Sequence, residues 1–336
     1  MKTRLLPTDT PVAFDAAVIE AVACLRAGDP VALPTETVYG LAANALRPEA
    51  VLKIFEAKER PFFDPLICHL PDRDWLERMT AIPEESGALV ETLISSFWPG
   101  PLTLVLPRRD IVPDIVTAGL PTVAVRMSAH PVFRAVCAAF GSPLAAPSAN
   151  RFGRISPTAA EHVRTELNGR IPLILDGGPT EHGLESTIVK VEGGGVHLLR
   201  AGPITEEQLL DHSMFVMHPV SVERPDAPGQ LKSHYAPHTT LRLFEVGTHF
   251  RAFADGPQQK IGCLAFSSPS PRGEFIAEEI LSPTGDLREA AATLFAKLRR
   301  LDEAGLDLIV AEPVPEHGLG IAIMDRLRKA AAEHVH

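Results

Sequence analysis

Hydrogen-bonding and basic side chains follow apolar runs in the first 130 residues, at positions where strands should end. "LPTETVYG" passes from an apolar run to Thr35, Glu36 and Thr37 and then to a glycine, and "TVAVR" closes on Arg126. A buried arginine needs an anion, which is either an internal carboxylate or part of a ligand. The first stretch suits a small polar ligand, although Thr and Glu also cap helix starts. Both stretches therefore indicate a binding site, with a structural alternative for each.

A second group of residues is suited to phosphate. "AKERPFFDPLICHL" places Lys58 and Arg60 at a predicted helix end and His69 on the strand that follows, while "APSANRFGRISPT" gathers Ser148 and Ser156 in one loop before a helix. Such a loop offers hydroxyls, backbone N–H groups and a helix N-terminus to a phosphate. Two alternatives stay open, because cations complement a helix C-terminus and Ser followed by Pro is an ordinary helix start. The glycine-rich G-x-x-x-x-G-K-[ST] and G-x-G-x-x-G nucleotide motifs are absent.

The stretch "LKSHYAPHTT", residues 231–240, is unusual for a connector because it carries a lysine, an aromatic residue and two histidines. The H-x3-H spacing of His234 and His238 suggests a metal site, but Pro237 between them disfavours the helix that would align both rings. We therefore predict no metal site of certain identity. The alternative is a strap that folds over the site of the first domain, because ordering such side chains requires compensating contacts.

The periodicity of apolar residues predicts three segments. Residues 1–207 form an α/β domain with a mixed, twisted sheet, residues 208–240 form the linker and strap, and residues 241–336 form a small Rossmann-like α/β domain with a parallel sheet. Helices are predicted over 14–28, 48–60, 86–97, 130–140 and 157–167, and strands at "PVALP", "LICHL", "LTLVLP", "TVAVRM", "PLILD" and "STIVKV".

Composition limits the function classes. The 336 residues are 45% hydrophobic and 22% charged, as in water-soluble globular proteins, and no apolar run approaches a membrane span or a signal peptide. The four cysteines are widely spaced and predict reduced thiols in the cytoplasm. Net charge is −10, and residues 1–205 carry 19 Lys and Arg against 23 Asp and Glu. Tight binding to a long nucleic acid is therefore not expected.

Several motifs occur in a fixed order: PTETVYGL, K-x-R-P-x-x-x-P-L, PSAN-x-x-G-x-x-SPT, ESTIVKV, LLRAGPIT, SHYAPHTT and the closing GLGIAIMDRLRKAA. Over essentially its whole length the chain resembles the threonylcarbamoyl-AMP synthases, the two-domain branch of the YrdC-like family. The resemblance implies a nucleotidyltransferase that converts L-threonine, bicarbonate and ATP, with Mg²⁺, to threonylcarbamoyl-AMP and pyrophosphate. It also implies downstream transfer proteins that place the threonylcarbamoyl group on adenosine next to the anticodon of tRNA.

The resemblance also assigns residues by motif. Around threonine it implies Thr35, His69, Arg126, Ser186 and the main chain of Ala146. Around ATP it implies Lys58, Arg60, Asp64, Thr122, Ser148, Ser156, Arg200 and Tyr235, with Lys58 and Arg60 as the catalytic cations. Two positions depart from the family pattern: Asp64 stands where Asn is common, and Phe152 where Ser is common. A carboxylate at position 64 would lie near a triphosphate, and a metal-facing role for it stays open.

Two other functions remain as alternatives. An RNA-binding module would use a concave, locally basic surface, which the acidic balance of the first domain disfavours. A carbamoyl-transfer enzyme of the YrdC-like superfamily would add acylphosphatase and zinc-finger segments, and the chain has no paired CxxC motifs.

Overall fold

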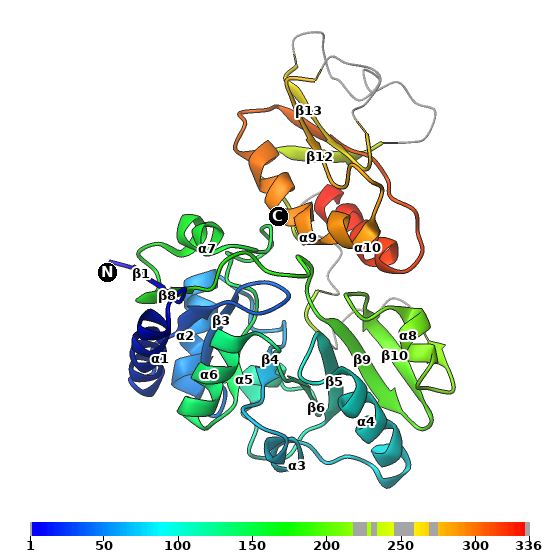
Figure 1. Cartoon of the computed structure of the whole chain (residues 1–336). Coiled ribbons are helices and arrows are strands. Elements are labelled where there is room, and N and C mark those ends of the chain that lie inside the picture. The colour runs from blue at the N-terminus through cyan, green and yellow to red at the C-terminus, as the bar shows by residue number, and fades with distance from the viewer. Residues whose placement is uncertain (1, 218–226, 230–233, 245–258, 269–274, 333–336) are drawn as a thin grey trace.

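The computed structural model describes residues 2–217, 227–229, 234–244, 259–268 and 275–332. It contains a large mixed sheet and a small parallel sheet, as the sequence predicts (Figure 1). The large sheet has eleven strands in the order β1-β8-β2-β3-β7-β4-β6-β5-β9-β10-β11. Its strands are β1 Arg4–Pro7, β2 Val31–Leu33, β3 Gly40–Asn44, β4 Ile67–His69, β5 Leu102–Pro107, β6 Thr122–Arg126, β7 Leu144–Ala145, β8 Leu173–Asp176, β9 Thr187–Glu192, β10 Gly195–Arg200 and β11 Val216–Met217.

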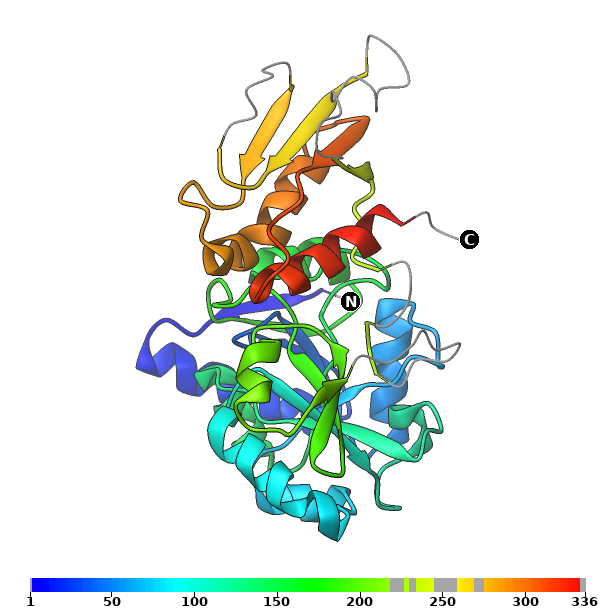
Figure 2. The ribbon, with the colours of Figure 1, turned by 90° about the vertical axis from the view of Figure 1, so that its right-hand side faces the viewer.

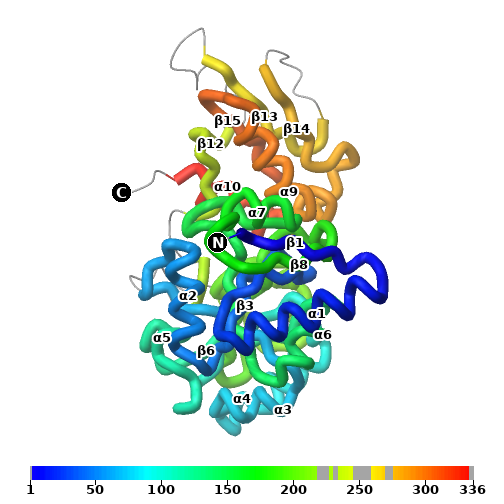
Figure 3. Tube along the Cα trace, turned by 90° about the vertical axis from the view of Figure 1, so that its left-hand side faces the viewer, coloured from blue at the N-terminus to red at the C-terminus, as the bar shows by residue number. Residues whose placement is uncertain are grey.

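Helices cover two faces of the large sheet. Alternate residues of β2 point to opposite sides: Val31 and Leu33 pack with α1 Pro11–Arg26 and α6 Pro131–Phe140, while Ala32 joins the larger core on the other face. Figure 3 shows α1 and α6 side by side along the first of these faces. The other elements of this domain are α2 Pro48–Lys58, α3 Asp74–Met79, α4 Glu84–Phe97, α5 Asp114–Thr117, α7 Ala160–Leu167 and α8 Glu206–Leu210.

The C-terminal domain has a sheet in the order β12-β15-β13-β14, and all of its pairs are parallel. Figure 2 shows its two helices, α9 and α10, between this sheet and the first domain. The amphipathic sequence of both helices explains this position, because one stripe packs on the small sheet while other side chains reach the first domain. The elements are β12 Thr240–Leu243, β13 Ile261–Ala265, β14 Ala277–Ile280, α9 Leu287–Asp302, β15 Leu308–Ala311 and α10 Leu319–Ala331.

The two domains meet in a closely packed junction. The apolar cluster of the C-terminal domain includes Val38, Ile155 and Leu184 of the first domain. Gly183 has φ +67°, and a Cβ atom built there would lie 2.5 Å from the carbonyl oxygens of both Ala291 and Ala292 on α9. Only glycine permits both this backbone conformation and this approach. The loop before β9 is thereby held directly against the C-terminal domain.

Candidate functional site

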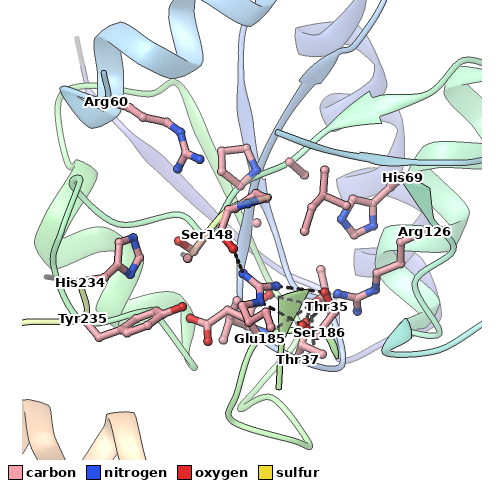
Figure 4. A pocket seen from close by; sticks show the side chains of 18 residues that line it. Thr35, Thr37, Arg60, His69, Arg126, Ser148, Glu185, Ser186, His234 and Tyr235 are labelled. Carbon is pink, nitrogen blue, oxygen red and sulfur yellow. Dashed lines mark hydrogen bonds between the residues drawn. The ribbon is translucent and has the colours of Figure 1, made fainter. Parts of the chain in front are cut away.

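A polar pocket lies where the first domain meets the strap. It has an empty volume of about 530 Å³, including its open mouth, and among the residues that line it are Thr35, Thr37, Val38, Gly40 and residues 146–148, 185–186, 228–229 and 234–235. Figure 4 shows Arg60, His234 and Tyr235 toward one side and His69 and Arg126 toward the other. We call these the strap end and the Arg126 end. Nine of the thirteen residues predicted from the sequence line this pocket: Thr35, Arg60, His69, Arg126, Ala146, Ser148, Ser186, Arg200 and Tyr235.

At the Arg126 end, two neighbouring strands present their last residues side by side. His69 of β4 is the register partner of Arg126 of β6 in a parallel pair. Arg126 Nη2 lies 2.5 Å from Glu36 Oε1, Nη1 donates to Thr37 Oγ1 (3.1 Å), and Nε donates to the Gly100 carbonyl (3.2 Å). The anion that a buried arginine requires is therefore present within the protein. Two of the five guanidinium N–H groups remain for a ligand.

Glu36 is held ionised by its neighbours. Burial alone would raise its pKa, but the Arg126 guanidinium and the Ser128 hydroxyl, which donates to Glu36 Oε2 (2.5 Å), lower the pKa to about 2. Both side chains of the pair are at most 5% exposed. Breaking such a pair leaves a buried charge without compensation, so Glu36 and Arg126 form a single structural unit.

His69 offers a neutral imidazole to the pocket. Burial, followed by the nearby Arg126 charge, lowers its pKa to about 3, and its ring packs on Phe133 with centroids 4.4 Å apart. His69 Nδ1 has no hydrogen-bond partner within the described residues. The Thr35 hydroxyl, in contrast, donates to the Val38 carbonyl (2.6 Å) and accepts from two N–H groups of the same turn. Of these two residues, His69 is the one with an unused polar atom.

At the strap end, Arg200 is a buried cation whose partners are neutral. Its Nε donates to the Ser186 carbonyl (3.0 Å), Nη2 to the Ser186 hydroxyl (3.1 Å) and Nη1 to the Pro228 carbonyl (3.3 Å). Within the described residues no carboxylate lies at ion-pair distance from Arg200. A Cβ built on Gly229 would lie 2.8 Å from the Tyr235 hydroxyl and 3.0 Å from Arg200 Cδ, so these three residues crowd one corner. The positive charge of Arg200 in this corner is therefore not paired with a carboxylate.

Arg60 is paired with the unusual carboxylate at position 64. Arg60 Nη2 lies 2.8 Å from Asp64 Oδ2, but without hydrogen-bond alignment, so neither Asp64 oxygen accepts a directed hydrogen bond from the described residues. Burial raises the Asp64 pKa, and the adjacent Arg60 charge opposes that rise. Arg60 also donates to the Pro65 carbonyl (2.9 Å). Thr122 is the first residue of β6, two positions before the partner of Ile67 on β4, and it is not among the residues that line the pocket.

Lys58 is not among the residues that line the pocket. Its side-chain amine donates to the carbonyls of Ser148 and Asn150, at 2.5 Å each, and the residue is 1% exposed. Burial and then the Arg60 charge lower its pKa well below the usual value. In this structure Lys58 fixes the PSAN loop against the end of α2, which positions Ser148 rather than presenting the amine to the pocket.

Ser156 does not begin a helix, because α7 starts four residues later with Ala159 as its N-cap. The alternative that Ser156 is a helix cap is therefore wrong. The Ser156 hydroxyl instead donates to Glu185 Oε1. Four polar side chains at or beside the pocket are not among the residues that the resemblance assigns to threonine or ATP, although the quoted motifs contain all of them: Glu36, Thr37, Glu185 and His234.

The described part of the strap reaches the pocket. His234 and Tyr235 line it, and Tyr235 adopts φ +64° with its ring 5.6 Å from that of Phe295 on α9. His238 points elsewhere and contacts Asp302 of α9 (3.1 Å), so the H-x3-H spacing does not bring both imidazoles to one point. Lys232, the lysine of this stretch, lies outside the described residues.

The fold and the pocket define a two-domain α/β protein with a polar pocket lined by three buried arginines, Arg60, Arg126 and Arg200. Residues 23–202 match the Sua5_yciO_yrdC family, described as telomere recombination, and residues 204–332 match the threonylcarbamoyl-AMP synthase C-terminal domain. The chain therefore belongs to the two-domain threonylcarbamoyl-AMP synthase family.

Relatives agree over nearly the whole chain. The threonylcarbamoyl-AMP synthase of Bacillus subtilis is 42% identical over 98% of this chain and 96% of its own length. The synthase of Pyrococcus abyssi is 41% identical over 94% of each chain. The crystal structure of Pyrococcus abyssi Sua5 complexed with L-threonine superimposes with a TM-score of 0.87 at 39% identity, covering 98% of both chains.

Proposed function

We propose that this chain makes threonylcarbamoyl-AMP, pyrophosphate and water from L-threonine, bicarbonate and ATP, and is thus a nucleotidyltransferase. The observation that carries the proposal is the division of the pocket. One end offers a neutral imidazole and an arginine with two free N–H groups, and the other offers a buried arginine without a carboxylate partner. An amino acid suits the first end and a triphosphate the second. The relative that was solved in complex with L-threonine supports threonine as a ligand of this fold.

At the Arg126 end, the free N–H groups of Arg126 would hold the threonine carboxylate, and His69 Nδ1 would bond to the same ligand. Ser186 lies between the ends, where its hydroxyl contacts both Thr103 (2.8 Å) and Arg200. Threonine bound here directs its amine toward the strap end, where bicarbonate and the α-phosphate would meet it. Such positioning can supply much of the rate enhancement, because the amine is itself the nucleophile.

In the overall reaction, the threonine nitrogen gains a bond to the bicarbonate carbon and water leaves. An oxygen of the resulting carbamate gains a bond to the α-phosphorus as the bond to pyrophosphate breaks. Arg200 and Arg60 would stabilise the charge on the leaving group. The closing strap supports the chemistry because a carbamate of threonine decomposes in water. Tyr235, 1% exposed, and His234 exclude solvent from that side.

Mg²⁺ would bind together with the nucleotide. Within the described residues no cluster of three or more acidic, His or Cys side chains forms a stand-alone metal site. Mg²⁺ commonly uses one or two carboxylates plus substrate phosphates, and Asp64, whose oxygens accept no directed hydrogen bond, fits the role of a single protein ligand. When bound with ATP, the ion supplies charge neutralisation at the phosphate oxygens.

The product would pass to proteins that transfer the threonylcarbamoyl group to tRNA, and we place this work in the cytoplasm. All four cysteines are free thiols, which supports a reducing compartment. No helix within the described residues is long and apolar enough to cross a membrane.

The test is pyrophosphate release by the purified full-length chain with ATP, Mg²⁺, bicarbonate and labelled threonine. We expect release that requires both bicarbonate and threonine, with one labelled adenylate formed per pyrophosphate. Release that continues without threonine, or labelled product without bicarbonate, would contradict the proposed reaction.

A further inference from the structure

Helix α10 of the C-terminal domain reaches residues that line the pocket. Arg326, 1% exposed, donates from Nε to Glu185 Oε2 (3.1 Å) and from Nη1 to the Ala201 carbonyl (2.8 Å). Its guanidinium carbon lies 5.4 Å from the centre of the Tyr235 ring. Glu185 and Tyr235 both line the pocket, and Arg326 does not. Arg326 therefore acts on the site through other residues.

A second residue of α10 holds the strap. The Lys329 side-chain amine donates to the Gly229 carbonyl (2.6 Å), and the Lys329 carbonyl accepts the N–H of His234 (3.3 Å). Gly229 and His234 also line the pocket. Three described strap residues at the pocket, Gly229, His234 and Tyr235, thus each contact α10.

We propose that Arg326 is a positioning residue for the active site, so that the C-terminal domain sets the shape and charge of the strap end. This inference deepens the proposed synthase function and rests on it. Glu185 has both oxygens engaged, one by Ser156 and one by Arg326, so its carboxylate is held in one orientation. Without Arg326 an uncompensated carboxylate would face the position proposed for triphosphate and repel it.

Arg326 also helps to keep Tyr235 in place. A tyrosine at φ +64° is unfavourable and persists only where the surroundings hold it. The Arg326 guanidinium near one part of the ring and Phe295 beside another provide such surroundings. Loss of Arg326 should therefore release the strap as well as the Glu185 charge.

The junction contains a matched control. Arg299 of α9 is also buried and pairs with a first-domain carboxylate, Glu166 of α7, at 3.2 Å. Glu166 does not line the pocket. Glu166→Gln removes an interdomain ion pair without touching the strap, whereas Arg326→Met removes one that supports it. If Arg326 only held the two domains together, Arg326→Met and Glu166→Gln should have similar effects on exchange and on activity.

The experiment compares full-length wild type, Arg326→Met, Arg326→Lys and Glu166→Gln. Hydrogen exchange without ligands is followed in residues 184–187 and 234–236, and kcat and KM are measured for ATP and for threonine. We expect Arg326→Met to speed exchange in both segments and to lower kcat/KM for ATP at least tenfold, mostly through KM. Arg326→Lys should recover part of this loss, and Glu166→Gln should stay within about twofold of wild type.

Equal exchange and equal kcat/KM in Arg326→Met and Glu166→Gln would overturn the proposal. If Arg326→Met does not fold, Arg326→Gln provides the comparison, because it removes the guanidinium but keeps a polar side chain, and exchange and kcat/KM equal to those of Glu166→Gln would then refute the positioning role. A wild type that makes no adenylate would refute the proposed function instead, and the exchange data would still decide whether α10 holds the strap.

Discussion

The two ends of the pocket are built in different ways. The Arg126 end comes from the first domain alone, and its buried arginine already has a carboxylate partner in Glu36. The strap end combines Arg60 and Arg200 of the first domain with the strap, and α10 supports it. Arg200 has no carboxylate partner among the described residues. The Arg126 charge is thus compensated before a ligand binds, whereas at the strap end Arg60 is paired with Asp64 and only Arg200 gains its counter-charge from the ligand.

Because of this difference, we expect the two ends of the pocket to bind their ligands in different ways. At the Arg126 end, selectivity depends on hydrogen-bond geometry at fixed strands. At the strap end, binding an anion offsets the cost of a buried cation, so ligand affinity and strap order should be coupled. Substitutions at the two ends should accordingly differ in their effects on stability.

The largest expected effect is at the Arg126–Glu36 pair. Arg126→Met leaves Glu36 buried without a counter-charge and should cost about 3–5 kcal/mol of unfolding free energy, measured by denaturant titration. Adding Glu36→Gln should restore most of that stability. Threonine KM should stay raised tenfold or more in the double variant. A double variant with normal threonine KM would show that Arg126 is only a structural ion-pair partner.

The same pair predicts an acid-sensitive contribution to stability. The folded pKa of Glu36, about 2, lies below the usual 4.5, so the stabilisation is complete above pH 4.5 and is lost as pH falls toward 2. The shift corresponds to about 3 kcal/mol at neutral pH. The unfolding free energies of wild type and Glu36→Gln should therefore converge in that window. A difference that stays constant from pH 6 to pH 3 would contradict the ionised, paired state of Glu36.

Substitution of Arg200, unlike that of Arg126, should weaken ATP binding strongly while it changes stability little. Arg200→Met removes a buried charge that has only neutral protein partners, so thermal stability should fall little. The KM for ATP should rise about tenfold to a hundredfold, because a charge-assisted bond is worth roughly 1.5–3 kcal/mol. A large loss of stability with unchanged KM for ATP would make Arg200 a structural residue of the strap.

The smallest of these changes is Tyr235→Phe. Alanine is a poor test because the ring is buried against Phe295 and its loss would leave a cavity. Phenylalanine removes only a buried hydroxyl that has no hydrogen-bond partner within the described residues. Stability should be unchanged or slightly higher, and kcat/KM for ATP should fall about tenfold if the hydroxyl contacts a phosphate. Full activity in this variant would reduce Tyr235 to an anchor of the strap.

Much of the fold could be predicted from sequence where local pattern and tertiary environment agree. The Leu- and Val-rich run "LTLVLP" coincides with β5, and the proline at position 48 marks the start of α2 as expected. Strand β3, "GLAAN", was not predicted because its small residues have weak strand preference. Its conformation depends on pairing with β2, which directly precedes it, and with β7, which lies far along the sequence.

Prediction from sequence is limited in the same way for the residues of the pocket. Thr35, His69, Arg126 and Arg200, which the motifs contain, all line one pocket in the structure. No local pattern reveals that Glu36 neutralises Arg126 across 90 residues, or that Arg326 reaches Glu185 across 141. Such pairs form only when distant elements pack. Sequence therefore identifies the chemical groups, while the fold decides which charges remain for a ligand.

The most direct test of the two-ended pocket is a crossed calorimetric titration. Threonine and a non-hydrolysable ATP analogue with Mg²⁺ are each titrated into wild type, Arg126→Met with Glu36→Gln, and Arg200→Met. We predict that the first variant loses threonine affinity while the Kd of the ATP analogue stays within about twofold of wild type, and that Arg200→Met shows the reverse. Equal weakening of both ligands in both variants would contradict the account.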